Sequence, residues 1–459
     1  MTAAEATPEI DIEQSDRAFM GHPKGLGFLS FVEGCERFSY YSMQTLLVLY
    51  MVKFLLLPEN IGKVAGLPAL QQWYGLSGQP LASKIFGAYT GLVYVTPILG
   101  GIIADRWLGR RATLIAGAVV MALGHFLMAF QGAFLFALIS LVVGVGLFKG
   151  NIATQVGELY GPNDLRRATA FQIFYIAIQI SVIAAPLVSG TLGEDVGWHY
   201  GFGCAGLVMV AGLLLYIYAK PWLPADNRPS RSNGAVKREK LHQDDWPRLI
   251  VLITLIPIMA IALLTNQEIF NAYLVWADEH FQLTFLGKTM PTSWMITIDA
   301  AASFIMLVAV TWFWKWYADR YEREPNELGK MIIGSAFTVA GGLCLVIAAA
   351  TQGDTKIGLF WPLMFHILNS IGFGHTLPVS LALFTKVAPK ALTATVVGLY
   401  YLAFFGANIV VGTVGGWYST MDTVQFWLLH VAAAAVGLVA FVVLKFSLGK
   451  VLNQAPTQV

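Results

Sequence analysis

The sequence predicts an all-α integral membrane protein of two six-helix bundles, with 12 transmembrane helices in total. Of its 459 residues, 56% are hydrophobic and 12% are charged, which is about half the charged fraction of a soluble domain. Apolar runs of about 18–30 residues follow one another, and each is long enough to cross a bilayer core of about 30 Å. One long charged connection separates six of these runs from the other six.

Each predicted span is an apolar run bounded by polar or charged residues. The spans are expected near 27–57, 84–104, 113–131, 134–156, 169–190, 200–219, 249–276, 292–316, 331–351, 358–385, 393–417 and 424–447. Two bundles therefore occupy residues 25–220 and 248–447, and a charged cytoplasmic linker at 221–247 joins them. The polar residues 1–24 lack the basic start and apolar core of a signal peptide, so they predict a cytoplasmic tail, as do residues 448–459.

The placement of basic residues predicts the orientation of the chain. With both termini in the cytoplasm, five of the 29 basic residues fall in outer loops, and two, Arg37 and Lys149, fall within spans. All the others then lie on the cytoplasmic side, as the positive-inside rule requires. We therefore expect a multi-pass protein of the cell membrane with both termini inside.

Composition also narrows the possible partners. A net charge of +2 gives no argument for nucleic-acid binding. The three cysteines lie far apart in apolar stretches, which is typical of small core residues rather than of a disulfide set or a metal site. We expect no metal and no other cofactor.

A polar stripe interrupts the first apolar run. Glu33, Glu36, Arg37, Tyr40 and Tyr41 stand at positions i, i+3, i+4, i+7 and i+8, which share one face of a helix. A charge at the centre of a bilayer costs about 2.5–3.5 kcal/mol, so such residues normally face an interior cavity and a partner. The stripe is therefore interpreted as a binding or coupling site, and the competing interpretation is an internal ion pair that only fixes helix packing.

A loop motif occurs in both halves. After the second span, Gly101, Asp105, Arg106 and Arg110 belong to a glycine-to-aspartate-arginine pattern, and an Ala-Asp-Arg sequence at 318–320 follows the eighth span. Echoes in corresponding loops are typical of transporters with internal repeats. The pattern resembles the loop signature of the major facilitator superfamily. That resemblance implies two bundles that rock about a site near the membrane midplane, with these four residues as gating or structural elements.

Three stretches resemble one family, the proton-dependent oligopeptide transporters. The stripe at 33–41 is similar to that family's first-helix signature, and 144–152 is similar to its fourth-helix segment. The stretch 174–181 resembles its fifth-helix signature. The resemblance implies a symporter that imports di- or tripeptides by alternating access, with protons as the coupling ion.

The second half departs from the family pattern. The family has adjacent Glu and Gln in its seventh helix, whereas this chain has Gln267-Glu268 in the reverse order. A tenth-helix glutamate that engages the peptide amino end is replaced, the nearest residues being Phe373 and His375. Asp299, at the position of an eighth-helix asparagine, and Glu268 are the candidates to replace this acid, and both are predicted to take part in proton coupling.

The residues together suggest a mechanism. Arg37 offers a planar fork and Lys149 a point charge, and together they suit a carboxylate. When deprotonated, Glu33 or Glu36 pairs with Arg37; when it is protonated, Arg37 is released for the substrate. We therefore expect protonation of the glutamates to couple to carboxylate binding. Further contacts to the substrate are expected from Tyr40, Tyr41, Tyr94, Asn151, Tyr175, Gln179 and Asp299.

The sequence is also compatible with two alternative functions. One is a proton-coupled carrier of another small carboxylate or amino-acid derivative, because the tenth helix is altered. The other is a polytopic membrane enzyme, although the sequence holds no metal-ligand cluster and no nucleophile–His–acid grouping. The expected partners are a small peptide, protons and the lipid bilayer, and the chain is expected to work as a monomer.

Overall fold

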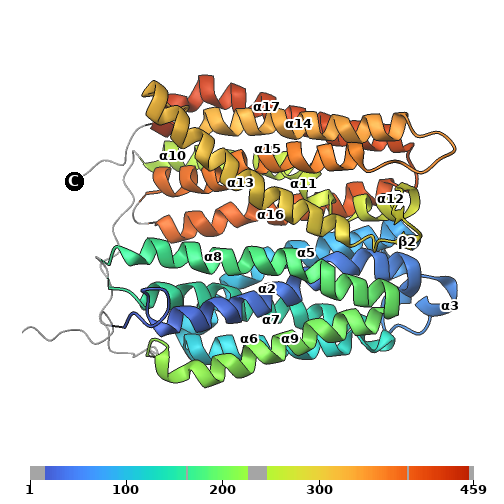
Figure 1. Cartoon of the computed structure of the whole chain (residues 1–459), viewed down its shortest axis with the longest axis horizontal. Coiled ribbons are helices and arrows are strands. Elements are labelled where there is room, and N and C mark those ends of the chain that lie inside the picture. Colours follow the sequence, from blue (N-terminus) through green and yellow to red (C-terminus); the bar gives the residue numbers. More distant parts are fainter. Residues whose placement is uncertain (1–15, 162–163, 226–244, 390–391, 454–459) are drawn as a thin grey trace, which may run out of the picture.

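The fold is a bundle of long helices that run roughly parallel to one another (Figure 1). The computed structural model describes residues 16–161, 164–225, 245–389 and 392–453. Eleven helices in these residues are long and apolar enough to cross a membrane. The polar helix that carries the stripe, Lys24–Tyr50, makes the twelfth, so the predicted helix count is confirmed. The chain is a multi-pass membrane protein.

The first half of the chain forms one side of the bundle. Its long helices are α2 (Lys24–Tyr50), α5 (Gly78–Ile103), α6 (Arg110–Leu127), α7 (Phe134–Glu158), α8 (Arg166–Ala185) and α9 (Trp198–Ala219). Short turns extend or connect them: η1 (Met51–Leu55), α3 (Pro58–Ile61), α4 (Leu67–Tyr74), η2 (Ala104–Leu108), η3 (Gln131–Ala133), η4 (Pro186–Gly190), η5 (Leu192–Val196) and η6 (Lys220–Trp222). We call the end of the molecule where α2 begins the near face, and the end where it finishes the far face.

The second half forms the other side. Its elements are α10 (Asp245–Ala262), α11 (Leu264–Glu268), α12 (Ala272–His280), α13 (Trp294–Tyr321), α14 (Glu327–Ala350), α15 (Phe360–Val387), α16 (Thr393–Val414), η8 (Gly415–Trp417) and α17 (Thr423–Asn453). A two-residue hairpin, β1 (Thr284–Phe285) with β2 (Lys288–Thr289), precedes α13. Leu286 and Gly287 both have positive φ, which matches the right-handed twist of a tight hairpin.

The seventh span differs from its prediction. We predicted one continuous helix over 249–276, but the structure divides it into α10, α11 and α12. The break is at Asn271, whose φ of −121° and ψ of −111° are not helical. No Gly or Pro marks this position, and the break is instead held by side-chain contacts, from Glu268 three residues earlier and from Ser83 of the first half. The predicted linker at 221–247 and the terminal tails lie mostly outside the described residues.

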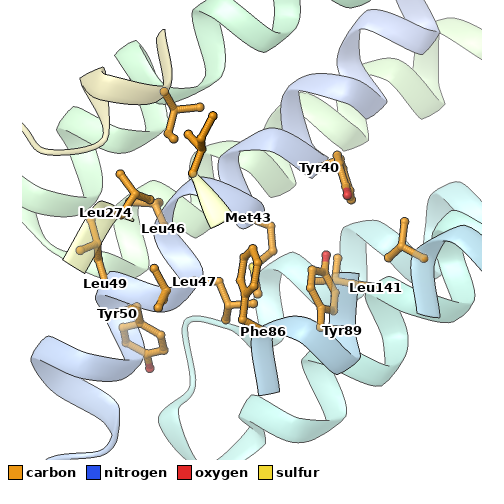
Figure 2. Close-up of a cluster of buried hydrophobic side chains, with 14 of the residues drawn as sticks. Tyr40, Met43, Leu46, Leu47, Leu49, Tyr50, Phe86, Tyr89, Leu141 and Leu274 are labelled. Atoms are coloured by element: carbon orange, nitrogen blue, oxygen red, sulfur yellow. The ribbon is translucent and has the colours of Figure 1, made fainter. Parts of the chain in front are cut away.

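Buried apolar side chains join α2 to its neighbours in both halves. Figure 2 shows Met43 of α2 beside Phe86 of α5, and Leu274 of α12 near Leu46 and Leu49 of α2. These side chains are almost completely buried. Because α2 packs against both halves here, its polar stripe is held at the centre of the molecule.

The two halves touch most closely along α5 and α16. A Cβ placed on Gly87 would collide with the backbone of Asn408 and Gly412, so the two helix backbones meet with no side chain between them. Glycine is required for such an approach. The contact lies toward the far face, because α5 begins there and α16 finishes there.

Candidate functional site

The polar stripe of α2 forms a buried ion cluster. Arg37 donates from Nε and from a terminal nitrogen to the two carboxylate oxygens of Glu36, the second bond being 2.7 Å long. Its Nε also lies 3.3 Å from a Glu33 oxygen. Glu33, Glu36 and Arg37 are 4%, 0% and 5% exposed. The spacing therefore brings two acids onto one guanidinium, and Glu33 Oε2 has no hydrogen-bond partner among the described residues.

Lys149 adds a second cation beside this cluster. It is half-buried on α7, and its ammonium group lies 5.0 Å from the centre of the Tyr94 ring. It interacts electrostatically with Glu33, Glu36 and Arg37, but no carboxylate of the described residues lies within ion-pair distance of it. A cation with no paired anion in this interior position is suited to bind one.

A cavity of about 440 Å³ lies between the two halves. Its walls contain five of the residues predicted to contact substrate: Tyr41, Tyr94, Tyr175, Gln179 and Asp299. From the second half, it is also lined by Asn266, Gln267, Phe270, Phe373, Tyr400, Tyr401 and Phe404. The volume suits a small solute.

Other predicted site residues do not line the cavity. The charged cluster of α2 and Lys149 are not among its lining residues. Tyr40 is buried, and its hydroxyl lacks a partner among the described residues. Asn151 donates its amide to the Leu147 carbonyl, 2.8 Å away within its own helix. Its side chain therefore supports α7 rather than facing a solute in this structure.

Glu268 points away from the cavity and caps the break in the seventh helix. Its Oε1 accepts from the Asn271 side chain at 2.9 Å and from the Ala272 backbone N–H at 3.1 Å. Its Oε2 lies 3.4 Å from Nε2 of His430, and both side chains are fully buried. The cavity wall at this level is instead lined by Asn266 and Gln267.

Asp299 is part of a hydrogen-bonded chain that the sequence did not predict. His366 Nδ1 lies 2.8 Å from Asp299 Oδ1, and its Nε2 lies 2.8 Å from the hydroxyl of Tyr273. The three residues come from α13, α15 and α12. Because His366 stands 67 residues from Asp299, no local spacing could have linked them. His375, the other tenth-span histidine, accepts from the Trp314 indole instead, while Phe373 lines the cavity.

The predicted loop motif lies at the near face. Asp105 is 3.6 Å from Arg110, which also pairs with Glu158 at the end of α7. Gly101 has open space around it, whereas a Cβ on the preceding residue, Gly100, would collide with the carbonyl of α7 at Gly146. The close helix approach is therefore made by Gly100 and not by Gly101. Arg106 has no hydrogen bond or ion pair among the described residues.

Polar contacts between the halves lie toward the far face. Lys53 pairs with Asp278 at 2.8 Å. The Glu194 carboxylate accepts the backbone N–H groups of Thr292 and Ser293, at 2.9 and 2.8 Å, just before α13 begins. Among the described residues, all hydrogen bonds between the halves lie in this far-face region. We call this set of contacts the far-face seal.

Comparisons with known proteins agree with this architecture. A family model described as Major Facilitator Superfamily matches residues 38–413. The peptide transporter YePEPT of Yersinia enterocolitica is 29% identical over 470 residues, covering 87% of this chain and 89% of the relative. A di-/tripeptide transporter of Lactococcus lactis subsp. cremoris is 25% identical over 501 residues, covering 95% and 98%. The crystal structure of a mutant POT peptide transporter with alafosfalin superposes with a TM-score of 0.85 at 25% identity, covering 96% and 98%.

Proposed function

Because this chain belongs to the major facilitator superfamily, we propose that it is a proton-coupled symporter that imports di- and tripeptides by alternating access. Membership of a transporter superfamily removes the membrane-enzyme alternative. The similarity to named peptide transporters over nearly the whole chain supports peptides as the substrate class.

The distribution of charge in the site supports a zwitterionic substrate. Arg37 and Lys149 place two cations in the first half, and Asp299 places a carboxylate on the wall formed by the second half. A short peptide carries a carboxylate at one end and an ammonium group at the other. The cations attract the first and Asp299 attracts the second, because charges interact strongly in an interior of low dielectric constant.

The observation that carries the proposal is the buried cluster of Glu33, Glu36 and Arg37. One guanidinium pairs with two carboxylates, while Lys149 nearby has no anion partner among the described residues. A proton on either glutamate weakens its hold on Arg37, and the guanidinium can then bind the carboxylate of a substrate. Proton binding and substrate binding thus favour each other, which is the condition for symport.

Uptake by liposomes containing the full-length protein tests this proposal. Labelled dialanine is expected to accumulate when the lumen is alkaline, and dialanine amide, which lacks the carboxylate, is expected to compete poorly. Lys149→Gln is expected to weaken dialanine uptake, whereas Lys288→Gln changes an exposed lysine of the hairpin and serves as the matched control. Uptake that ignores the pH gradient, or equal competition by the amide, would contradict the proposal.

A second candidate is a proton-coupled carrier of another small carboxylate or amino-acid derivative. The observation that favours it is Phe373, an apolar residue on the cavity wall near the position where the related family has an acid. The liposome assay distinguishes this candidate from the peptide symporter. If the protein carries another small carboxylate, small monocarboxylates are expected to outcompete dialanine.

We also propose a location, an orientation and an oligomeric state for the protein. The positive-inside distribution supports a cell-membrane location with the near face in the cytoplasm. The cavity lies within one chain, between its own two halves, which supports a functional monomer.

A further inference from the structure

We propose that His366 determines which solutes the cavity accepts, by setting the charge that Asp299 presents to the cationic end of the solute. This inference rests on the proposed function and adds a specificity residue to it. Asp299 supplies the only carboxylate among the described residues that line the cavity, and no lysine or arginine lines it. Its side chain is 11% exposed, so it reaches the cavity while most of its surface remains covered.

The hydrogen-bonded chain of Asp299, His366 and Tyr273 can take up one additional proton and remain hydrogen-bonded. His366 is fully buried, with one ring nitrogen on Asp299 and the other on the Tyr273 hydroxyl. With a neutral ring, Nδ1–H donates to the carboxylate and the tyrosine hydroxyl donates to Nε2. With a protonated ring, both nitrogens donate, and the hydroxyl accepts instead after rotating about its C–O bond. Neither state leaves a ring nitrogen unsatisfied.

The two states present different charges to the cavity. Beside a neutral imidazole, Asp299 keeps its full negative charge and attracts an ammonium group. Beside an imidazolium 2.8 Å away, that charge is compensated, and the attraction is largely cancelled. The proton on His366 and the cationic end of the solute therefore compete for the same carboxylate.

Surrounding elements bring no other charged group into ion-pair contact with this pair among the described residues. The only titratable side chains of α8 and α16 that line the cavity are tyrosines, among the described residues. On α12, Asp278 and Glu279 are in the last turn, bound to Lys53 and Tyr418; on α14, Glu327 and Lys330 are in the first turn, at the near face. The Glu268–His430 pair lies beyond Trp427, whose ring is 6.2 Å from that of Tyr273.

The experiment compares two ligands that share a carboxylate end and differ at the amino end. Dissociation constants of dialanine and N-acetyl-dialanine are measured with purified full-length protein at several pH values between about 5.5 and 7.5. Their ratio isolates the amino end, because any effect of Glu33, Glu36 or Arg37 on the carboxylate end enters both constants. We expect the preference for dialanine to fall by about tenfold or more toward the acidic limit.

Variants identify the groups that cause this change. In His366→Asn, the preference for dialanine is expected to persist and to lose its pH dependence, because Asp299 remains. In Asp299→Asn, the preference is expected to fall about 30-fold at neutral pH, since one partner of a close charge pair is removed. Tyr273→Phe removes only the hydroxyl behind the ring and is expected to shift the pH at which the ratio changes, so the inference does not depend on one buried histidine variant folding.

Each outcome has a definite meaning. A ratio that changes with pH in the parent protein and is constant in His366→Asn supports the inference. A constant ratio in the parent protein, or an unchanged pH dependence in His366→Asn, overturns it while leaving peptide transport in place. If dialanine does not bind at any pH, the proposed function fails, and this inference fails with it.

Discussion

Glu36 and Arg37 are consecutive in the sequence, yet the guanidinium of one holds both carboxylate oxygens of the other. Glu33, one turn earlier, reaches the same guanidinium at 3.3 Å. One guanidinium balances only one of the two carboxylates, and Lys149 nearby forms no ion pair with either acid among the described residues, so a proton can bind to either acid. This arrangement makes the cluster the natural place for a coupling proton, and the role remains a prediction.

Glu36→Gln is expected to uncouple transport from the proton gradient. The amide cannot be deprotonated, and it keeps only one oxygen for Arg37. Gradient-driven uptake of dialanine should fall at least about tenfold, which corresponds to about 1.4 kcal/mol of lost coupling, while exchange of dialanine across the membrane continues. Glu59→Gln, at an exposed carboxylate of the short helix α3, is the control. Full gradient-driven uptake by Glu36→Gln would show that the coupling proton binds elsewhere.

Replacing Glu268 tests whether it caps a helix or carries a proton. Glu268→Gln keeps an oxygen for Asn271 and Ala272, and its amide can donate to His430, whose other nitrogen binds the Phe426 carbonyl. This variant is expected to retain uptake and thermal stability. Glu268→Ala leaves two buried donors unsatisfied, at about 1–3 kcal/mol each, and should unfold at a lower temperature. Loss of gradient-driven uptake in a stable Gln variant would mean that Glu268 carries a proton.

Two glycine substitutions distinguish the effect of a close helix contact on stability from the effect of helix propensity. Gly87→Ala forces a methyl group against the backbone of α16 and is expected to cost about 1–3 kcal/mol of stability. Gly203→Ala, within α9, meets no atom within 4 Å and should leave stability unchanged or slightly higher. Thermal unfolding in detergent measures both variants. Equal midpoints for the two would show that the halves do not need to touch at Gly87.

The surroundings of His22, at the near face, predict that the stability of the folded protein depends on pH. Burial lowers its pKa, and the charge of Arg166 lowers it further, while Asp164 acts in the opposite direction. The folded protein then binds this proton less readily than the unfolded chain, so the contribution of His22 to stability falls as the pH drops below about 6.5.

Thermal unfolding at about pH 7.5 and about pH 5.5 checks this sign. His22→Gln should show a smaller decrease in midpoint between the two values than the parent protein. The exposed His199→Gln should behave like the parent. A larger decrease in His22→Gln would reverse the assignment.

Sequence alone predicts much of the fold, because length and apolar character decide which segments can cross a bilayer. The number of spans follows from the apolar runs, and the resemblance to the transporter family is confirmed by the relatives. The break at Asn271 could not be predicted, because no Gly or Pro marks it and part of what holds it comes from the other half of the chain. It is stabilised by the Glu268 side chain and by Ser83 of the first half, 188 residues away.

The two clusters of the candidate site also differ in how far the sequence predicts them. Glu33 and Arg37 stand four residues apart on one helix, so their spacing alone predicts that they meet. Asp299, His366 and Tyr273 belong to three helices, and only the packed bundle brings them together. Local periodicity encodes the first cluster, whereas tertiary structure creates the second.

The composition of the far-face seal has a consequence for the medium in which the protein works. Lys53 and Asp278 are 42% and 24% exposed, so dissolved ions reach this pair and screen it over a Debye length of about 8 Å at physiological ionic strength. The bonds from Glu194 to backbone N–H groups are more covered and respond less. Concentrated electrolyte at the far face therefore lowers the free energy needed to part the halves there, and dilute medium raises it. The ionic strength of the medium is therefore expected to influence how readily the empty protein opens at this face.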